Sequence, residues 1–204
     1  ALSPAYSHLY LCIAGELAAV ICIHDPLRRE ARDAVAALHA CGIGKVVMMT
    51  GDNRQTAQAV ARAVGVDAVY AEVLPEDKAA FIRSEKAAGR TVIMVGDGVN
   101  DSPALSEADA GVAISTGAAI AREIADITIA SEDLSELVTL RRLSQALMAR
   151  IHRNYRFIVG FNLSLILLGV AGILPPTTSA LLHNMSTLGI SLKSMTDLQP
   201  DQPQ

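Results

Sequence analysis

The chain has 204 residues, of which 51% are hydrophobic and only 3% aromatic, and its formal net charge at pH 7 is -4. This length allows one well-buried α/β domain and a smaller second part. The negative charge argues against a nucleic-acid partner, and the mean hydropathy of +0.34 is high for a soluble domain and predicts that part of the chain contacts lipid.

Short β-rich runs alternate with helical stretches from about residue 9 to residue 129, a pattern typical of a parallel sheet covered by helices. The first part predicts a hairpin with strands over 9–13 and 17–23. A helix is then expected, because Asp25 can cap it and Pro26 suits its first position.

Two more α/β units and two weaker strands complete this region. The expected elements are a strand over 45–49, a helix ending at Gly65, a strand over 68–70, a helix over 76–88, a strand over 91–95, a short helix opening at Ser102, and strands over 111–114 and 127–130. The predicted fold class is therefore α/β, with helices on both faces of a parallel sheet.

An uncharged run of 18 residues, 157–174, follows this region. As a helix it would be about 27 Å long, close to the hydrocarbon thickness of a bilayer. Pro175 and Pro176 interrupt it, and 177–195 gives a second, less apolar candidate. Five arginines precede the first run: Arg141, Arg142, Arg150, Arg153 and Arg156. The pattern predicts a two-helix transmembrane hairpin with both ends, and the α/β domain, in the cytoplasm; the alternative is a buried helical hairpin of a soluble protein.

Polar clusters at 50–53 and 96–101 follow the predicted strands 45–49 and 91–95. The carboxyl ends of parallel strands are where ligands bind in such sheets. Carboxylates suit a hard cation. However, each of the carboxylates of Asp97 and Asp101 would repel a phosphoryl charge about 4 Å away by about 4 kcal/mol at an effective dielectric constant of about 20. We therefore expect Mg²⁺ and a lysine beside the phosphate, and Lys78 can supply that second positive charge.

Each cluster also has a simpler interpretation. Thr-Gly-Asp-Asn at 50–53 is by itself a good turn sequence. Gly96-Asp97-Gly98 is similar to the start of a dinucleotide fingerprint, but Asp101 stands where the third glycine would be needed.

Three strings, 50–53, 75–78 and 96–105, closely resemble the characteristic motifs of P-type ATPases, whose phosphorylation domain has the haloacid-dehalogenase-like fold. The segment 25–28 (Asp-Pro-Leu-Arg) is similar to the motif where the chain of these pumps returns from the nucleotide-binding domain. The compact spacing and the single closing hairpin resemble the heavy-metal-transporting branch. The resemblance implies a membrane enzyme that uses ATP and Mg²⁺ to move metal cations.

The resemblance also assigns roles by position. Asp97 would coordinate Mg²⁺ with Asp101 completing the site; Lys78 and Asn100 would contact the phosphoryl group; Thr50 and Gly51 would hold its oxygens; Asp52, Asp25 and Arg28 would lie toward the nucleotide. The stretch 183–187 resembles the last membrane helix of divalent-metal pumps, which favours zinc, cobalt or manganese over copper. His183, with Asn162 and Ser186, is the implied candidate for the ion path.

The 204 residues contain no Asp-Lys-Thr-Gly-Thr string, which carries the nucleophile of these pumps. We therefore expect a C-terminal fragment that is inactive without the N-terminal part of the same pump. Its expected divisions are 1–24, the end of the nucleotide-binding domain and a return strand; 25–140, the phosphorylation domain; 141–196, a linker helix and the membrane hairpin; and 197–204, a polar tail.

Two other functions remain possible at this point. One is a free-standing, membrane-anchored phosphatase of the same superfamily with Asp25 as nucleophile, although Leu27 stands where such enzymes usually have a second acid. The other is a non-catalytic membrane-anchored binding module.

Overall fold

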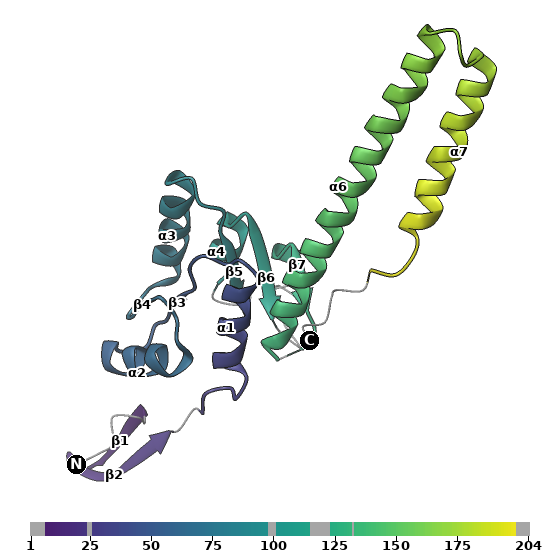
Figure 1. The fold of residues 1–204 in the computed structure, drawn as a ribbon. Helices are drawn as coiled ribbons and strands as arrows, with labels where there is room; N and C mark the ends of the chain where they lie inside the picture. Colours follow the sequence, from purple (N-terminus) through teal and green to yellow (C-terminus); the bar gives the residue numbers. More distant parts are fainter. Residues whose placement is uncertain (1–6, 24–25, 98–100, 115–122, 132, 199–204) are drawn as a thin grey trace. The chain divides into compact units, whose positions relative to one another are not determined.

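The computed structural model describes residues 7–23, 26–97, 101–114, 123–131 and 133–198, and the expected site residues Asp25 and Asn100 lie outside them. The chain divides into two compact units, 1–138 and 139–204. The first unit holds the strands and the shorter helices, and the second holds a helical hairpin (Figure 1).

The first unit begins with the predicted β-hairpin. Strands β1 (Ser7–Ile13) and β2 (Glu16–Ile23) pair antiparallel with Ile13 opposite Glu16. The two residues between them, Ala14 and Gly15, have φ angles of 53° and 86°. Positive φ at both positions is the geometry of a type I′ two-residue turn. Gly15 adopts it freely, whereas a positive φ is uncommon for a residue with a side chain such as Ala14.

The remaining strands of the unit are all parallel, as expected. Their bounds are Val47–Met49 for β3, Ala68–Tyr70 for β4, Ile93–Gly96 for β5, Ala110–Ile114 for β6 and Ile127–Ile129 for β7. β3 pairs with β4, and β5, β6 and β7 form a separate sheet in that order. The parallel α/β class is confirmed, but the described residues make two sheets where one was expected, because they supply no strand that joins β3 to β5.

Four helices accompany these strands: α1 (Ala31–Ala40), α2 (Arg54–Val64), α3 (Pro75–Ala87) and α4 (Ser102–Glu107). The expected start of α1 at Pro26 is wrong, because the helix begins five residues later, at Ala31. Helical stability comes mainly from a buried face. Ala31 and Ala34 are buried, whereas Leu27 in the preceding segment is exposed. α1 joins a small core of Ala34, Cys41 and Val138.

An aspartate fixes the start of each parallel strand pair. Asp67, Asp109 and Asp126 accept hydrogen bonds at Oδ2 from the backbone N–H groups of Val46 (2.6 Å), Val92 (2.8 Å) and Gly111 (2.8 Å), respectively. Each carboxylate satisfies an N–H group at or near the start of the neighbouring strand.

Gly111 of β6 lets α4 approach the sheet closely. A Cβ atom at this position would lie 2.6 Å from the carbonyl oxygen of Leu105 and 3.2 Å from its carbonyl carbon. Leu105 and Val112 are almost fully buried at this contact region. Only glycine therefore allows the backbone of α4 to reach its observed position.

The second unit consists of an antiparallel helical hairpin. α6 (Ser135–Val170) starts in the first unit, and α7 (Pro176–Ser194) begins with proline at its first position, one residue before the expected range of 177–195. At the open end, Arg150 donates to the carbonyl oxygens of Ser194 (3.3 Å), Thr196 (2.7 Å) and Asp197 (2.9 Å).

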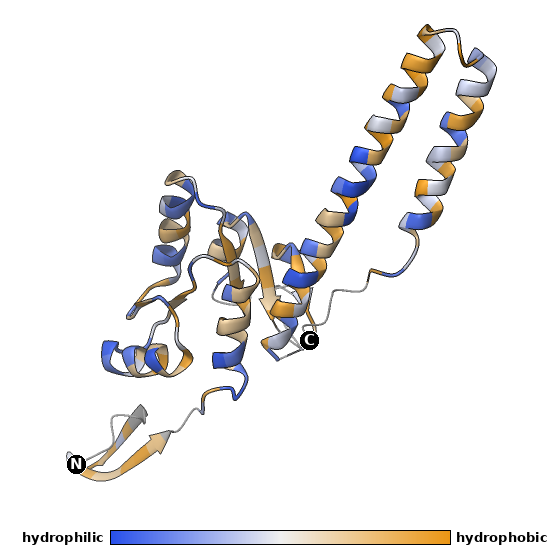
Figure 2. Cartoon of the chain, in the orientation of Figure 1, coloured by the Kyte–Doolittle hydropathy of each residue, from blue (hydrophilic) through white to orange (hydrophobic). Residues whose placement is uncertain are grey.

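Hydropathy changes along α6 from mostly hydrophilic to mostly hydrophobic toward the turn (Figure 2). Within the described part of the chain, no helix combines the length and the apolar character needed to cross a membrane. The hairpin itself is present, and the transmembrane character expected for it is not confirmed.

Candidate functional site

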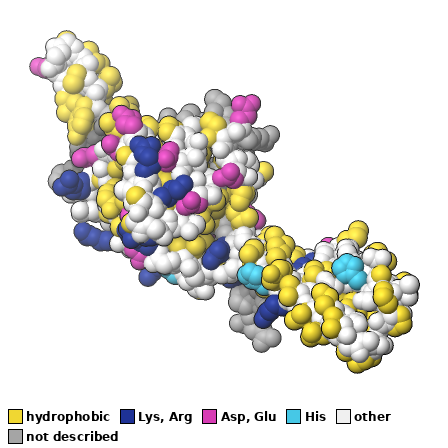
Figure 3. Space-filling model, turned by 90° about the horizontal axis from the view of Figure 1, so that it is seen from above, with side chains coloured by type: hydrophobic (Ala, Val, Ile, Leu, Met, Phe, Trp, Pro, Cys, Tyr) yellow, Lys and Arg dark blue, Asp and Glu magenta, His cyan; other side chains and the backbone are white. Residues whose placement is uncertain are grey.

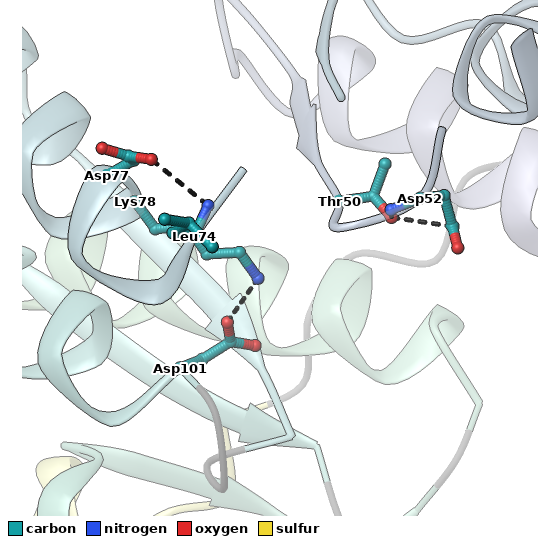
Figure 4. A network of polar contacts seen from close by, with 6 residues as sticks. All are labelled: Thr50, Asp52, Leu74, Asp77, Lys78 and Asp101. Carbon is teal, nitrogen blue, oxygen red and sulfur yellow. Dashed lines mark hydrogen bonds and ion pairs between the residues drawn. The ribbon is translucent and has the colours of Figure 1, made fainter. Parts of the chain in front are cut away.

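The centre of the candidate site is an ion pair between Lys78 and Asp101 (Figure 4). Lys78 lies in the first turn of α3, and Asp101 immediately precedes α4. The Nζ atom of Lys78 lies 2.6 Å from Oδ1 of Asp101, and the two side chains are only 15% and 13% exposed. The two residues are 23 positions apart, so the fold brings together a lysine and a carboxylate that the sequence placed in different motifs.

Local capping places Lys78 and Asp101. Pro75 occupies the first position of α3, and the N–H of Leu74 donates to Oδ2 of Asp77 at 3.3 Å. The carbonyl oxygen of Asp101 accepts from Leu105 at 2.8 Å, which makes Asp101 the residue from which α4 begins.

Gly96 at the end of β5 provides space for the Asp101 side chain. A Cβ atom on Gly96 would lie 2.8 Å from Cβ and 2.9 Å from Cγ of Asp101. Any side chain there would therefore displace the carboxylate. Asp97 follows directly and is exposed. Sequence reasoning placed Gly96 at the start of the polar cluster but missed that it makes room for Asp101.

The Thr50–Asp52 loop after β3 forms the other side of the candidate site (Figure 4). The hydroxyl of Thr50 donates to Oδ2 of Asp52 at 2.8 Å and accepts from the N–H of Asp52 at 3.1 Å. Asn53 then caps α2 by accepting from the N–H of Thr56 at 3.0 Å. Residues 50–53 therefore form a turn and the start of α2, and the turn agrees with their composition.

Three backbone hydrogen bonds fasten this loop to the segment that leads into α3. Thr50 donates to Tyr70 and accepts from Val73, both at 3.0 Å, and Glu72 donates to the carbonyl oxygen of Asp52 at 2.9 Å. Glu72 has a φ of 57°, an unusual conformation for a residue with a side chain. These hydrogen bonds connect the loop to the segment before the helix that carries Lys78. The sequence did not predict this connection.

Arg28 lies in the segment before α1. Its positive charge acts on Asp133: the pKa of the Asp133 carboxyl is lowered mainly by the backbone N–H of Ser135, and the Arg28 charge contributes further. The nucleotide contact expected for Arg28 stays a prediction.

The donor set after β5 fits Mg²⁺. This ion is usually held by one or two carboxylates, with water and substrate phosphate completing its coordination. Asp101 provides one such carboxylate, in contact with Lys78, and Asp97, directly after β5, is the expected second one. Among the described residues, no group of three or more His, Cys, Asp or Glu side chains is placed to hold a metal ion.

The residues expected on the ion path lie in the helical hairpin. Nδ1 of His183 and Oδ1 of Asn162 are 2.8 Å apart and connect α7 to α6. Both residues line a groove of about 590 Å³ whose wall includes Leu165, Gly169 and Ser179. The hydroxyl of Ser186 instead donates to the carbonyl oxygen of His183 within its own helix, at 2.8 Å.

Comparison with known proteins agrees with this fold. The haloacid dehalogenase-like hydrolase family matches residues 3–109, just over half of the chain, so the chain belongs to this family. Its homologues are heavy-metal P-type ATPases. The copper-transporting ATPase 2 of Rhizobium meliloti (strain 1021) is 46% identical over 176 residues, which cover 86% of this chain and 21% of that protein.

A manganese-exporting P-type ATPase of Mycobacterium tuberculosis (strain ATCC 25618 / H37Rv) is 39% identical over 191 residues, 93% of this chain and 27% of that protein. The crystal structure of a zinc-transporting PIB-type ATPase in the E2.Pi state superposes with a TM-score of 0.82 at 28% identity, covering 95% of this chain and 32% of that chain. The chain thus spans about a fifth to a third of the length of these proteins.

Proposed function

We propose that the chain is the C-terminal portion of an ATP-driven heavy-metal cation pump and contributes the Mg²⁺- and phosphate-binding part of its aspartyl-phosphate chemistry. The observation that carries this proposal is the shielded Lys78–Asp101 pair beside the carboxyl end of β5. It puts a fixed cation next to the carboxylates, at the sheet edge where the phosphoryl group of an α/β enzyme would lie. The similarity to P-type ATPases over most of the chain supports the same assignment.

Positioning and charge neutralisation do most of the work in phosphoryl transfer. Lys78 would hold a phosphoryl oxygen while its contact with Asp101 fixes the ammonium group. The hydroxyl and backbone of the Thr50–Asp52 loop would orient the remaining oxygens, and that loop is already fastened to the segment before α3. Mg²⁺, held by Asp97 and Asp101, would supply the charge that lets a phosphoryl group approach two carboxylates.

The nucleophile would come from the N-terminal part of the same pump. On this chain, that N-terminal part would contact the β3–β4 and β5–β6–β7 sheets, which are not joined to each other. Ile93 and Val95 of β5 are 46% and 38% exposed, although β5 is an apolar strand. Covering these side chains with another segment of the pump would remove that apolar surface from water.

We also propose that the hairpin of α6 and α7 lies in a membrane, with the α/β unit on the cytoplasmic side. The uncharged run extends four residues beyond the end of α6, to Leu174. Hydrophobic side chains cover most of the visible face of the hairpin, and Val170 is 85% exposed (Figure 3). The arginines before residue 157 favour a cytoplasmic open end.

The cargo would be a divalent transition-metal ion bound through His183. If Asn162 Oδ1 accepts a hydrogen bond from Nδ1 of His183, the Nε2 lone pair is left for a metal. Imidazole and oxygen ligands suit zinc, cobalt or manganese better than copper(I), which prefers sulfur. Named relatives include copper- and manganese-transporting proteins, so the ion has to be decided by measurement.

Labelling with γ-labelled ATP tests the enzymatic proposal. The 204-residue chain alone should form no acid-stable label, whereas the full-length protein should form an acyl-phosphate. Asp97→Asn in the full-length protein should slow phosphoenzyme turnover at least about 100-fold, because a full charge is lost from a hard-cation site. The exposed Asp33→Asn variant is the matched control. Acid-stable, hydroxylamine-sensitive label on the 204-residue chain would instead support the phosphatase alternative with Asp25 as nucleophile.

Metal-stimulated ATPase activity tests the cargo assignment. His183→Ala in the full-length protein should reduce stimulation by zinc, cobalt or manganese at least about tenfold, since a lost metal ligand costs more than 1.4 kcal/mol. Ser191→Ala is the control, because that hydroxyl bonds only to the Thr187 carbonyl in the described structure. Unchanged activity and metal preference in His183→Ala would rule the assignment out.

A further inference from the structure

The two units of the chain carry opposite charges. Residues 1–138 contain 11 Lys and Arg against 19 Asp and Glu, and residues 139–204 contain six against two. Their net charges are therefore -8 and +4, which together give the -4 of the whole chain. The helical hairpin is therefore basic, although the net charge of the whole chain is negative.

Four of these six basic residues, Arg150, Arg153, Arg156 and Lys193, lie near the open end of the hairpin. Arg153 and Arg156 lie in the two turns before the apolar run, and Lys193 lies in the last turn of α7. Asn154 bonds to Ser194 across the hairpin at 3.0 Å, which places the two helices at the same level. Arg150 to Arg156 cover about 9 Å of helix, so these cations form a narrow band. We call Arg153, Arg156 and Lys193 the basic band.

The basic band lacks acidic partners within the described part of the chain. No ion pair there involves any of its three side chains, which are all exposed. The printed contact of Arg156 is with the carbonyl oxygen of His152, at 3.4 Å, and leaves its positive charge uncompensated. Arg150 is different, because its guanidinium is already engaged by the carbonyl oxygens at the end of α7.

Exposed apolar side chains flank the basic band. Phe157 and Val159 follow Arg156 on α6, and Leu188 and Leu192 precede Lys193 on α7; all four are about half exposed or more. Exposed Ile151 and Tyr155 lie among the arginines. A surface on which cationic and apolar side chains meet within one helical turn matches a membrane interface, where phosphate groups lie just outside the hydrocarbon.

We propose that the basic band binds the headgroups of anionic phospholipids and so anchors the open end of the hairpin at the cytoplasmic leaflet. This inference rests on the proposed membrane location of the hairpin. Arg153 and Arg156 suit the role because the guanidinium fork donates two hydrogen bonds to a phosphate. A lipid with a net negative headgroup leaves that attraction uncancelled, whereas the ammonium group of a zwitterionic lipid opposes it.

Electron paramagnetic resonance of spin-labelled lipids around the 204-residue chain in bilayers tests the proposal. A basic residue near an anionic surface contributes about fivefold in binding. The measured preference is an average over all lipids that contact the hairpin. We expect this average to favour spin-labelled phosphatidylglycerol over spin-labelled phosphatidylcholine by about two- to fivefold. Arg153→Gln/Arg156→Gln should bring this ratio close to one, and about 1 M salt should do the same for the unchanged chain.

The control variant Arg29→Gln/Arg62→Gln removes two exposed arginines of the first unit and should keep the preference. A ratio near one in the unchanged chain, or a preference that survives in Arg153→Gln/Arg156→Gln, would overturn the lipid-binding proposal while leaving the membrane hairpin intact. Absence of a motionally restricted signal from either lipid would show that the hairpin does not enter the bilayer, and both proposals would fail.

Discussion

Replacing Gly111 with alanine should destabilise the α/β unit through α4. The added Cβ atom would meet backbone atoms of Leu105, with its carbonyl oxygen at 2.6 Å. To reach a tight contact of 3.0 Å the helix must move by 0.4 Å, and an ordinary contact of 3.4 Å requires 0.8 Å. Backbone cannot rotate away as the end of a flexible side chain can, so we expect the cost of overpacking, about 1–3 kcal/mol.

Thermal unfolding followed by far-ultraviolet circular dichroism measures this cost. For a unit of this size, 1 kcal/mol corresponds to about 4 °C, so Gly111→Ala should lower Tm by about 4–12 °C. Gly44→Ala is the matched control, because a Cβ at Gly44 would meet nothing within 4 Å and its φ is not in the left-handed region. If the two variants unfolded within about 1 °C of each other, the inferred close approach of α4 would be refuted.

Two further predictions concern Asp101 and Asp109. Gly96→Ala should push the Asp101 carboxylate away and slow phosphoenzyme turnover of the full-length protein at least about tenfold, because catalytic groups tolerate little displacement; activity equal to that of a Gly44→Ala control would contradict this. The backbone N–H of Val92 holds the pKa of the Asp109 carboxyl below its usual value. This carboxylate therefore stabilises the fold at neutral pH, and the contribution is lost as pH falls through the lowered pKa. Between about pH 5 and pH 2, the urea midpoint should fall less in Asp109→Asn than in the unchanged chain, and equal slopes would show that the hydrogen bond has no such effect.

The sequence predicted the end of an element well where a local signal marked it. α2 ends at Gly65, as expected, and Gly65 has a φ of 84°. This signal acts within a few residues, so it can be read without tertiary structure. The cap by Asn53 at the start of α2 is also local, but it was not predicted. α1 shows the opposite case, because Pro26 is compatible with a helix start but the burial of Ala31 and Ala34 decides where the helix begins.

The candidate site was predictable in its composition but not in its contacts. The motifs put Lys78 and Asp101 at one edge of a parallel sheet, since strand ends on the same edge meet. Their 2.6 Å contact depends on how α3 and α4 pack, which spacing along the chain does not encode. The sequence also could not predict the positive φ of Glu72. The hydrogen bond from its N–H group to the carbonyl oxygen of Asp52 forms only when two separate loops meet.

The aspartates that begin the parallel strand pairs have a consequence for the order of folding. Each bond closes a short stretch of chain, 21 residues from Val46 to Asp67, 17 from Val92 to Asp109 and 15 from Gly111 to Asp126. Loops of this length cost little entropy to close, and contacts between residues close in sequence form early. Each strand pair can therefore find its register as soon as its own segment leaves the ribosome. Parallel sheets are otherwise slow to assemble, and the three carboxylates let these two sheets assemble in steps along the growing chain.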